Sequence, residues 1–353
     1  MLPPPRVASA DWPRVLTPAA SCLPPAAETH RDERILCVPW TLAGCADRTS
    51  HSYLAALERV AASYREVPIG TDFVDVALLE AAEDIKPTLV FLNLQGPSLS
   101  PEFIAELRPL CDPTCVIVQW DGDQHHEPAD ERRRWFVGLG RVLDASLVVN
   151  VKHPAEYAAL GVQHPGFLGC GINETVWRPT TPTPGTPLIV CLANNWPQFN
   201  YAARNRAFAA VAAAFPDQFA VYGSGWEGSG APFPTRPFLP NEDQAGVYAA
   251  ARVALSISIR ADLPRYTSHR LFGALASGAV TLVERFPDCE GLGLVDGLNC
   301  ILWSGIDELL DKLHWLPLRP LEMQMAARRA GLLHSLPAFC DELTAIVDAV
   351  RGE

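Results

Sequence analysis

The sequence predicts an α/β protein built from two consecutive doubly wound domains. From residue 34 onward, short apolar runs alternate with longer amphipathic stretches, and a proline-rich break interrupts this alternation before it restarts. Continuous apolar strands separated by helices indicate parallel sheets that are covered on both faces. We therefore expect two Rossmann-like domains that face a central cleft, with ligands bound beyond the carboxyl ends of the strands.

The first half of the chain contains four apolar runs of strand length. Each run is short, rich in large or β-branched apolar residues and followed by polar or turn-forming residues, which is the pattern of a buried strand. The expected strands are 34–39, 88–93, 115–120 and 146–150. Apolar residues recur at helical spacing in 50–64, and another helix is expected near 101–110.

A proline-rich segment marks the predicted domain boundary. Residues 178–187 contain four prolines and a glycine, so they fit neither a helix nor a central strand. The alternation then restarts, with expected strands at 188–192, 218–222, 253–259 and 279–283 and expected helices at 201–215, 243–251, 268–277 and 306–316. A last helix is expected at about 338–350, where its sequence suits packing on either domain.

The composition excludes several classes of protein. Of the 353 residues, 48% are apolar and 19% charged, which is enough apolar material for buried cores. A net charge of −12 argues against a broad basic surface for duplex nucleic acid. No apolar run is long enough for a transmembrane helix, and the proline-rich extension 1–30 lacks the pattern of a signal peptide. These features predict a cytoplasmic protein.

The ten cysteines are scattered and form no C-x-x-C pair. Cys111 and Cys115 are the closest pair, and no histidine pair at zinc spacing lies nearby. Reduced thiols, as in a cytosolic protein, are therefore expected.

Polar residues that follow the strands of the second domain are the first candidates for a ligand site. Asn194 and Asn195 stand just before a helix, where they can hold a phosphate or a sugar hydroxyl, or simply cap the helix. Gly223 and Gly225 end the next strand and allow the backbone to approach a ligand, or to make a tight turn. The absence of the G-x-G-x-x-G spacing argues against an ordinary NAD dehydrogenase.

A second candidate lies at the start of the helix expected at 268–277. Thr267 or Ser268 can cap this helix, and Arg270 then lies in its first turn. A cation is unfavourable at the positive end of a helix, unless an anion also binds there. The backbone N–H groups, the dipole and the guanidinium would together suit a diphosphate. The alternatives are a solvated arginine and a salt bridge between the domains.

The first domain offers two carboxylates after a buried strand. Asp121 and Asp123 suit three roles: a general base or acceptor contact, a divalent metal site, or an ordinary Asp-Gly turn. Adjacent residues on a strand or a helix point in different directions, so the neighbouring pair His125 and His126 does not favour a zinc site. Trp40 and Thr41 follow the first strand and are expected to face the cleft, towards an acceptor.

Five segments, in this order, resemble those of CgeB-like and phage-type glycosyltransferases: Lys86–Gln95, Gln119–Asp123, Ala193–Phe199, Tyr222–Trp226 and Tyr266–Gly278. This resemblance implies the GT-B fold, with the acceptor bound mainly by domain 31–178 and the donor mainly by domain 179–336. It also implies a metal-independent reaction that needs no cofactor, and a C-terminal segment 337–353 whose helix returns to the first domain.

The resemblance also implies roles for individual residues. Arg270 is the expected diphosphate ligand and Asp123 matches the family's aspartate, which makes these two the expected catalytic residues, whereas Asp121 stands where the family has threonine. The expected donor-binding residues are Asn194, Asn195, Gly223, Gly225, Trp226, Tyr266, Ser268, His269, Arg270 and Glu290. One position departs from related families, because Gly273 stands where they often carry a glutamate that contacts the donor. Asp288 and Glu290 are the nearest substitutes.

These observations predict transfer of a sugar from a nucleotide-diphosphate donor to a hydroxyl acceptor, which is a glycan, protein, lipid or modified DNA base. Two alternatives remain open. One is a metal-dependent transferase that uses Asp121 and Asp123. The other is a non-catalytic nucleotide-sugar-binding or structural protein of the coat or spore type, and the glycine at position 273 gives it weight.

Overall fold

The computed structural model describes residues 32–40, 52–94, 98–122, 130–196, 201–315 and 320–352. The chain forms two compact units. The N-terminal unit contains the described residues up to Asn173 together with those from Ser335 onward, and the C-terminal unit is Glu174–His334. The predicted extension 1–30 and the predicted site residues Thr41 and Asp123 lie outside the described residues.

The N-terminal unit is built on a six-stranded parallel sheet with the strand order β2-β1-β3-β4-β5-β6. Its strands are β1 (Arg34–Val38), β2 (Ser63–Glu66), β3 (Leu89–Asn93), β4 (Val116–Asp121), β5 (Ala145–Val148) and β6 (Pro165–Phe167). Its helices are α1 (Ser52–Val60), α2 (Val74–Ile85), α3 (Pro101–Leu107), α4 (Glu131–Gly140), α5 (His153–Ala159) and α11 (Leu336–Arg351). The central strands β3 and β4 are buried along their whole length, as expected for a sheet covered on both faces.

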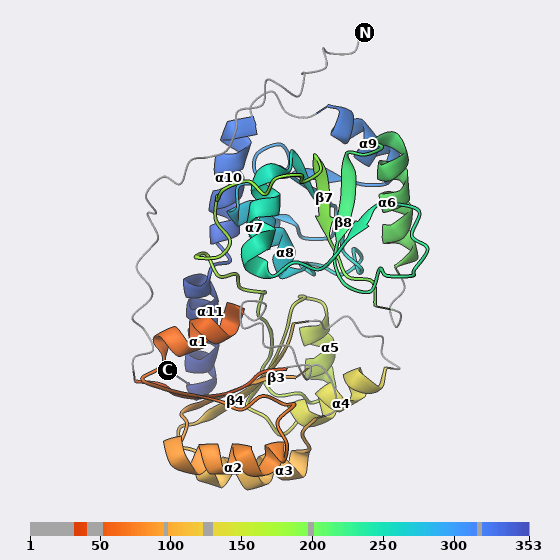
Figure 1. Ribbon diagram of the computed structural model, residues 1–353. Coiled ribbons are helices and arrows are strands. Elements are labelled where there is room, and N and C mark those ends of the chain that lie inside the picture. Colours follow the sequence, from red (N-terminus) through yellow and green to blue (C-terminus); the bar gives the residue numbers. More distant parts are fainter. Residues whose placement is uncertain are drawn as a thin grey trace. The chain divides into compact units, whose positions relative to one another are not determined.

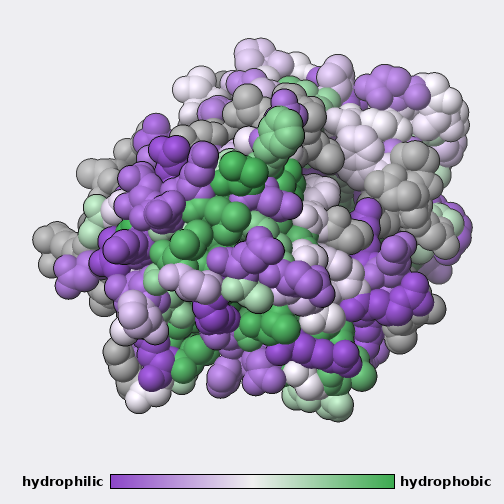
Figure 2. All heavy atoms as spheres, turned by 90° about the horizontal axis from the view of Figure 1, so that it is seen from below, coloured by the Kyte–Doolittle hydropathy of each residue, from purple (hydrophilic) through white to green (hydrophobic). Residues whose placement is uncertain are grey.

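Helices cover both faces of this sheet. In Figure 1, α2 and α3 lie together on one side of β3 and β4, and α1 and α11 lie together on the other. Figure 2 views the molecule from below and shows apolar residues in patches between hydrophilic ones. The exposed apolar side chains at the start of α2 are Phe73 and Val76.

Aromatic packing fixes the C-terminal helix α11 on the N-terminal unit. The Phe339 ring lies 6.3 Å from the Phe91 ring and 6.0 Å from the Trp120 ring, both measured between centroids. Tyr53 of α1 joins this cluster, 5.3 Å from Trp120. Gly171 leaves room for it, because a Cβ atom there would lie 3.0 Å from Phe339. These four aromatic side chains are all buried.

The C-terminal unit contains a second six-stranded parallel sheet, with the order β12-β11-β10-β7-β8-β9. Its strands are β7 (Ile189–Leu192), β8 (Phe219–Tyr222), β9 (Thr235–Arg236), β10 (Val253–Ser256), β11 (Thr281–Glu284) and β12 (Ile301–Trp303). Its helices are α6 (Ala202–Ala214), α7 (Asn241–Ala250), α8 (His269–Ala276), α9 (Ile306–His314) and α10 (Pro320–Leu332). The two parallel sheets confirm the predicted α/β class.

The strand order of this second sheet is the Rossmann order. The chain leaves β7 in one direction to form β8 and β9, then returns to the other side of β7 to form β10, β11 and β12. The strand order therefore reverses between β7 and β10. Open α/β sheets bind ligands at the carboxyl ends of the strands beside such a switch point.

The proline-rich segment 178–187 packs on the C-terminal unit. Thr183 donates a backbone hydrogen bond to Gly246 of α7 at 3.0 Å, and Arg236 donates to the Gly185 carbonyl at 3.0 Å. Trp177, which precedes the segment, is fully buried. The division between the units consequently falls before Glu174, upstream of the proline-rich segment.

Candidate functional site

Beside the switch point of the C-terminal unit, the loop that follows β7 meets the loop that follows β8. The Asn194 Oδ1 atom accepts a hydrogen bond from the Ser224 backbone N–H at 3.0 Å. Asn195 donates its own backbone N–H to Ser224 O at 2.9 Å and its side-chain amide to Gly225 O at 3.0 Å. Both predicted asparagines therefore hold one loop against the other.

Gly223 and Gly225 make this close approach possible. A Cβ atom on Gly223 would lie 2.1 Å from the Ala193 carbonyl oxygen, and one on Gly225 would lie 2.2 Å from the Asn195 oxygen. Gly225 also has a φ of +77°, which disfavours any residue with a side chain. The close approach that these glycines permit is thus between two loops of the protein.

Two predicted aromatic residues are buried in the unit. The Trp226 indole donates to the Ala193 carbonyl at 2.7 Å and packs edge-on against Phe208 and Phe233. Tyr266 is also buried. Trp226 therefore anchors the loop after β8 from the interior of the unit, and its ring is buried.

Arg270 lies in the first turn of α8, as the sequence predicts. Ser268 caps this helix, with its hydroxyl oxygen accepting a hydrogen bond from the Arg270 N–H at 3.3 Å. The Arg270 carbonyl accepts a hydrogen bond from the buried Tyr248 hydroxyl at 3.5 Å. Arg270 and His269 are both partly exposed. Within the described part of the chain, the Arg270 guanidinium has no hydrogen-bond or ion-pair partner.

A second arginine, which the sequence analysis does not single out, lies close to the first. Arg204 of α6 is buried, donates to the Asn194 carbonyl at 2.7 Å and stacks on the Tyr201 ring at 3.7 Å. Burial lowers the pKa of Arg204 to about 10, and the nearby positive charge of Arg270 contributes to this shift. The signal in the sequence is an arginine in an alanine-rich helix just after the Asn194–Asn195 loop.

Carboxylates lie at the end of β11 and in the loop that follows this strand. Burial raises the pKa of Glu284, the last residue of β11, to about 6, although its hydrogen bond with the Ser258 backbone acts in the opposite direction. Asp288 forms an ion pair with Arg265 at 2.5 Å. Glu290 begins a short 3-10 turn, Glu290–Leu292, and is exposed. Of the two substitutes suggested for the family's glutamate, Asp288 is thus already engaged by an arginine.

Gly273 faces a rigid neighbour. A Cβ atom on Gly273 would lie 2.7 Å from two atoms of the Trp177 indole, which is fully buried. A glutamate at this position would therefore require Trp177 to move. The glycine that departs from the family pattern is therefore the residue that allows α8 to pack against Trp177.

The predicted acceptor-side residues that the structure describes lie at the carboxyl ends of strands in the N-terminal unit. Asp121 is the last residue of β4 and is buried, and Trp40 follows β1 and is partly exposed. Asn93, the last residue of β3, donates to the Tyr53 hydroxyl. Within the described ranges, no group of three or more His, Cys, Asp or Glu residues is placed to hold a metal ion.

Comparisons with known proteins place the chain among glycosyltransferase folds. Residues 203–336 match the family described as glycosyl transferase-like. HepE from Anabaena, in a structure with UDP and glucose, superposes with a TM-score of 0.64 at 10% identity, over 90% of this chain and 100% of that one. A glycosyltransferase from Rickettsia africae superposes with a TM-score of 0.63 at 9% identity, over 90% of this chain and 98% of that one.

Sucrose-phosphate synthase from Thermosynechococcus elongatus gives a TM-score of 0.60 at 14% identity, over 91% of this chain and 100% of that one. No curated protein sequence matches the chain. Within the described residues, no helix combines the length and the apolar character needed to cross a bilayer. The chain therefore has the two-domain GT-B fold, and its residues 203–336 are similar to the glycosyl transferase-like family.

Proposed function

We propose that this protein is a glycosyltransferase that takes its sugar from a nucleoside-diphosphate donor bound at the switch point of the C-terminal unit. One observation supports this proposal most strongly. The Arg270 guanidinium stands in the first turn of a helix capped by Ser268, without a partner in the described part of the chain. A cation is unfavourable at the positive end of a helix. An anion that binds to the cation and to the helix N-terminus at the same time removes this unfavourable interaction.

The proposed reaction needs positive charge at this place. Breaking the bond between the sugar and the diphosphate leaves negative charge on the departing phosphate oxygens. Donors and cations that are already oriented towards those oxygens stabilise the transition state without further reorganisation. The Arg270 guanidinium and the positive end of the α8 dipole would meet this charge. Arg204 would add to the positive potential while it holds the Asn194 loop in place.

Uridine diphosphate sugars are the first donors to test. HepE, whose fold this chain shares, binds UDP and glucose in its structure. On the acceptor side we propose a hydroxyl group of a glycan, protein, lipid or modified DNA base, approached from the carboxyl ends of β1 and β4 in the N-terminal unit. Trp40, Thr41, Asp121 and Asp123 are the candidates there, with Asp123 as the proposed base. We further propose a metal-independent, hexosyltransferase-like reaction of the CgeB-like type in the cytoplasm.

A second candidate function is non-catalytic binding of a nucleotide sugar. The packing of Gly273 on Trp177 favours it, because this position carries no carboxylate that contacts the donor. Both candidates predict donor binding at Arg270, but only the first predicts turnover.

The test begins with thermal unfolding of the full chain in the presence of UDP, GDP, TDP and their sugars, each with and without EDTA. A ligand that binds only the folded state raises the melting temperature. We expect one nucleotide and its sugars to do so equally well with EDTA. A shift that EDTA abolishes would instead support the metal-dependent alternative at Asp121 and Asp123.

The second step is to measure release of the free nucleoside diphosphate from the stabilising donor, with candidate acceptors added in turn. Release that depends on an acceptor supports the transferase. A donor that binds but is not consumed with any acceptor supports the non-catalytic alternative. No thermal shift with any nucleotide would contradict both.

A further inference from the structure

An ion pair ties together the loops that follow β10 and β11, two neighbouring parallel strands of the C-terminal unit. The Arg265 Nε atom donates to the Asp288 carboxylate at 2.5 Å, and the Arg265 backbone N–H donates to the Pro287 carbonyl at 3.1 Å. The guanidinium also lies close against Gly291, where a Cβ atom would lie 2.4 Å from two of its nitrogen atoms. The backbone and the side chain of Arg265 are therefore both held by the loop after β11.

Both partners of this ion pair adopt an uncommon backbone conformation. Arg265 has a φ of +58° and Asp288 has a φ of +60°. The left-handed region is rarely populated by residues with a side chain, although aspartate and asparagine enter it more readily than most. A conformation of this kind persists only where the surrounding contacts impose it. The contacts between the two loops therefore outweigh the cost of two unfavourable backbone conformations.

The loop after β11 gives the ion pair a firm support. Phe286 and Cys289 are buried, and the Cys289 thiol donates to the Phe286 carbonyl at 2.9 Å. The Asp288 carbonyl accepts a hydrogen bond from the Gly291 N–H at 3.2 Å, at the start of the 3-10 turn Glu290–Leu292. Because these contacts fix the loop on both sides of Asp288, they also fix the place of its carboxylate.

The segment after Arg265 leads directly into α8. Tyr266 and Thr267 are both buried and separate Arg265 from Ser268, whose hydroxyl caps the helix by accepting a hydrogen bond from the Arg270 N–H at 3.3 Å. A change in the direction of the chain at Arg265 would therefore be passed through a short buried segment to the first turn of α8. The Arg270 side chain starts from that turn.

We propose that Arg265 and Asp288 are positioning residues for the donor diphosphate, because their ion pair holds the start of α8, and with it Arg270, in the orientation that binds the phosphates. This inference rests on the proposed donor site at Arg270. Neither Arg265 nor Asp288 contacts the donor in this account. Groups that are already oriented when a ligand arrives bind it with a smaller loss of conformational freedom, so breaking the ion pair should weaken binding.

The variant Asp288→Asn separates positioning from simple electrostatics. Asparagine tolerates a positive φ as aspartate does, so the substitution breaks the ion pair and keeps the backbone. If charge alone decided the outcome, losing a carboxylate and releasing a guanidinium would strengthen the binding of an anion. Positioning predicts the opposite sign. We expect the dissociation constant to rise about two- to fivefold, the range that a partly exposed ion pair supports.

The measurement is isothermal titration calorimetry of the full chain with whichever of UDP, GDP and TDP binds best. Arg265→Ala breaks the same ion pair from the other side and should also weaken binding. In an Arg270→Ala background, Asp288→Asn should cause no further loss of affinity, because the residue through which it acts is absent. A general loosening of the unit would weaken binding in both backgrounds. Circular dichroism of each variant ensures that folded protein is compared.

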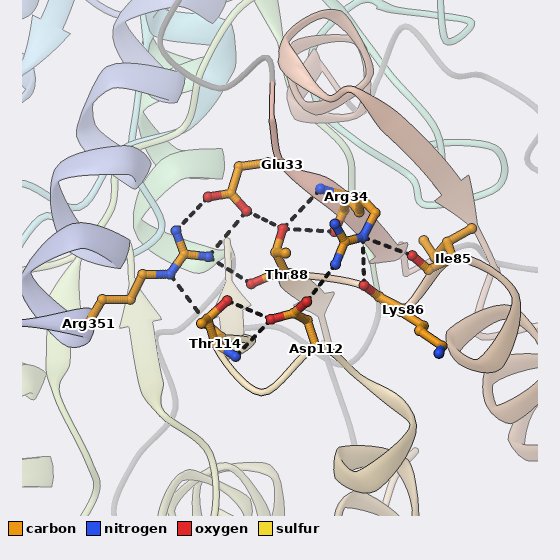
Figure 3. Close-up of polar contacts among 8 residues, drawn as sticks. All are labelled: Glu33, Arg34, Ile85, Lys86, Thr88, Asp112, Thr114 and Arg351. Carbon is orange, nitrogen blue, oxygen red and sulfur yellow. Dashed lines mark hydrogen bonds and ion pairs between the residues drawn. The ribbon is translucent and has the colours of Figure 1, made fainter.

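Two other ion pairs provide matched controls. Asp262→Asn breaks the pair with Arg260, which joins two residues of the loop after β10 at 2.8 Å and does not tie that loop to the next one. Asp112→Asn breaks the pair with Arg34, which is similarly exposed, measures 2.7 Å and lies at the amino ends of the strands in the N-terminal unit (Figure 3). We expect both variants to bind the nucleotide like the unmodified chain.

The possible results distinguish this inference from the proposed function. If the unmodified chain binds none of the three nucleoside diphosphates, the proposed function fails and the inference fails with it. If the unmodified chain binds one of them, three results overturn the inference alone. These are equal or stronger binding by Asp288→Asn, a further loss from Asp288→Asn in the Arg270→Ala background, and an equal loss in Asp262→Asn or Asp112→Asn.

Discussion

The contact between Gly273 and Trp177 gives a prediction whose sign depends on the neighbouring residue. In an isolated helix, Gly→Ala is stabilising by about 0.8–1 kcal/mol. At position 273, however, the new methyl group would lie 2.7 Å from two indole atoms. Trp177 is fully buried, so the ring has little room to move, and overpacking of this kind costs about 1–3 kcal/mol.

Taking the upper half of that range, we expect Gly273→Ala to lower the free energy of unfolding of the C-terminal unit by about 1–2 kcal/mol after the helix preference is subtracted. In a Trp177→Leu background the clash is removed, and the same substitution should then stabilise the unit by up to about 1 kcal/mol. The coupling free energy between the two positions is therefore about 2–3 kcal/mol.

The assay is urea unfolding of the four proteins of this double-mutant cycle, with hydrogen exchange in α8 used to assign the transition of the C-terminal unit. Gly138→Ala in α4 is the control for helix preference, because a Cβ atom there meets nothing within 4 Å. The reasoning is refuted if Gly273→Ala is neutral or stabilising with Trp177 present, or if it costs the same in both backgrounds.

Three further predictions follow from individual contacts. Gly225→Ala and Gly228→Ala both place a side chain at positive φ, which costs about 1–2 kcal/mol, but only the methyl group at position 225 would also meet a carbonyl oxygen, at 2.2 Å. Gly225→Ala should therefore lower the free energy of unfolding in urea more than Gly228→Ala does, and it alone should weaken UDP binding. Arg351→Ala loses the charge-assisted hydrogen bonds to Glu33 and to the Thr88 carbonyl, so it should lower the free energy of unfolding of the N-terminal unit by about 1.5–3 kcal/mol. It should also accelerate amide hydrogen exchange in α11, and unchanged exchange would contradict this prediction. Glu284 binds its proton more tightly when folded, so the stability it contributes is fully present below pH 4.5 and is lost as pH rises through about 6; Glu284→Gln should remove this loss, measured by urea unfolding across that range.

The central strands were predictable because both of their faces are buried. Each of β3, β4, β7, β10 and β11 shows up in the sequence as an apolar run. The edge strands β2 (Ser-Tyr-Arg-Glu) and β9 (Thr-Arg) contain no such run, since their pairing comes from a neighbouring strand and not from their own composition. No local pattern placed α11, whose Phe339 contacts depend on residues more than two hundred positions earlier.

In the candidate site, too, some features can be predicted from the sequence and others depend on the fold. The cap at Ser268 and the cation at Arg270 are adjacent in the chain, so the conflict between charge and helix dipole is visible from the sequence alone. Arg204 was missed because its relation to Asn194 and Arg270 exists only in the folded unit. The sequence likewise does not show why position 223 requires glycine, because the atom that a side chain there would meet, the Ala193 carbonyl oxygen, belongs to another loop.

The most direct test of the proposed donor site is the dissociation constant of UDP, measured by isothermal titration calorimetry for the unmodified protein, Arg270→Ala and Arg206→Ala. Arg206 is an exposed arginine on α6 of the same unit and serves as the charge-matched control. Losing charge-assisted hydrogen bonds worth about 1.5–3 kcal/mol should raise the dissociation constant about 10- to 150-fold in Arg270→Ala. Arg206→Ala should bind like the unmodified protein. Equal affinity in all three would contradict the assignment of Arg270 as the diphosphate ligand.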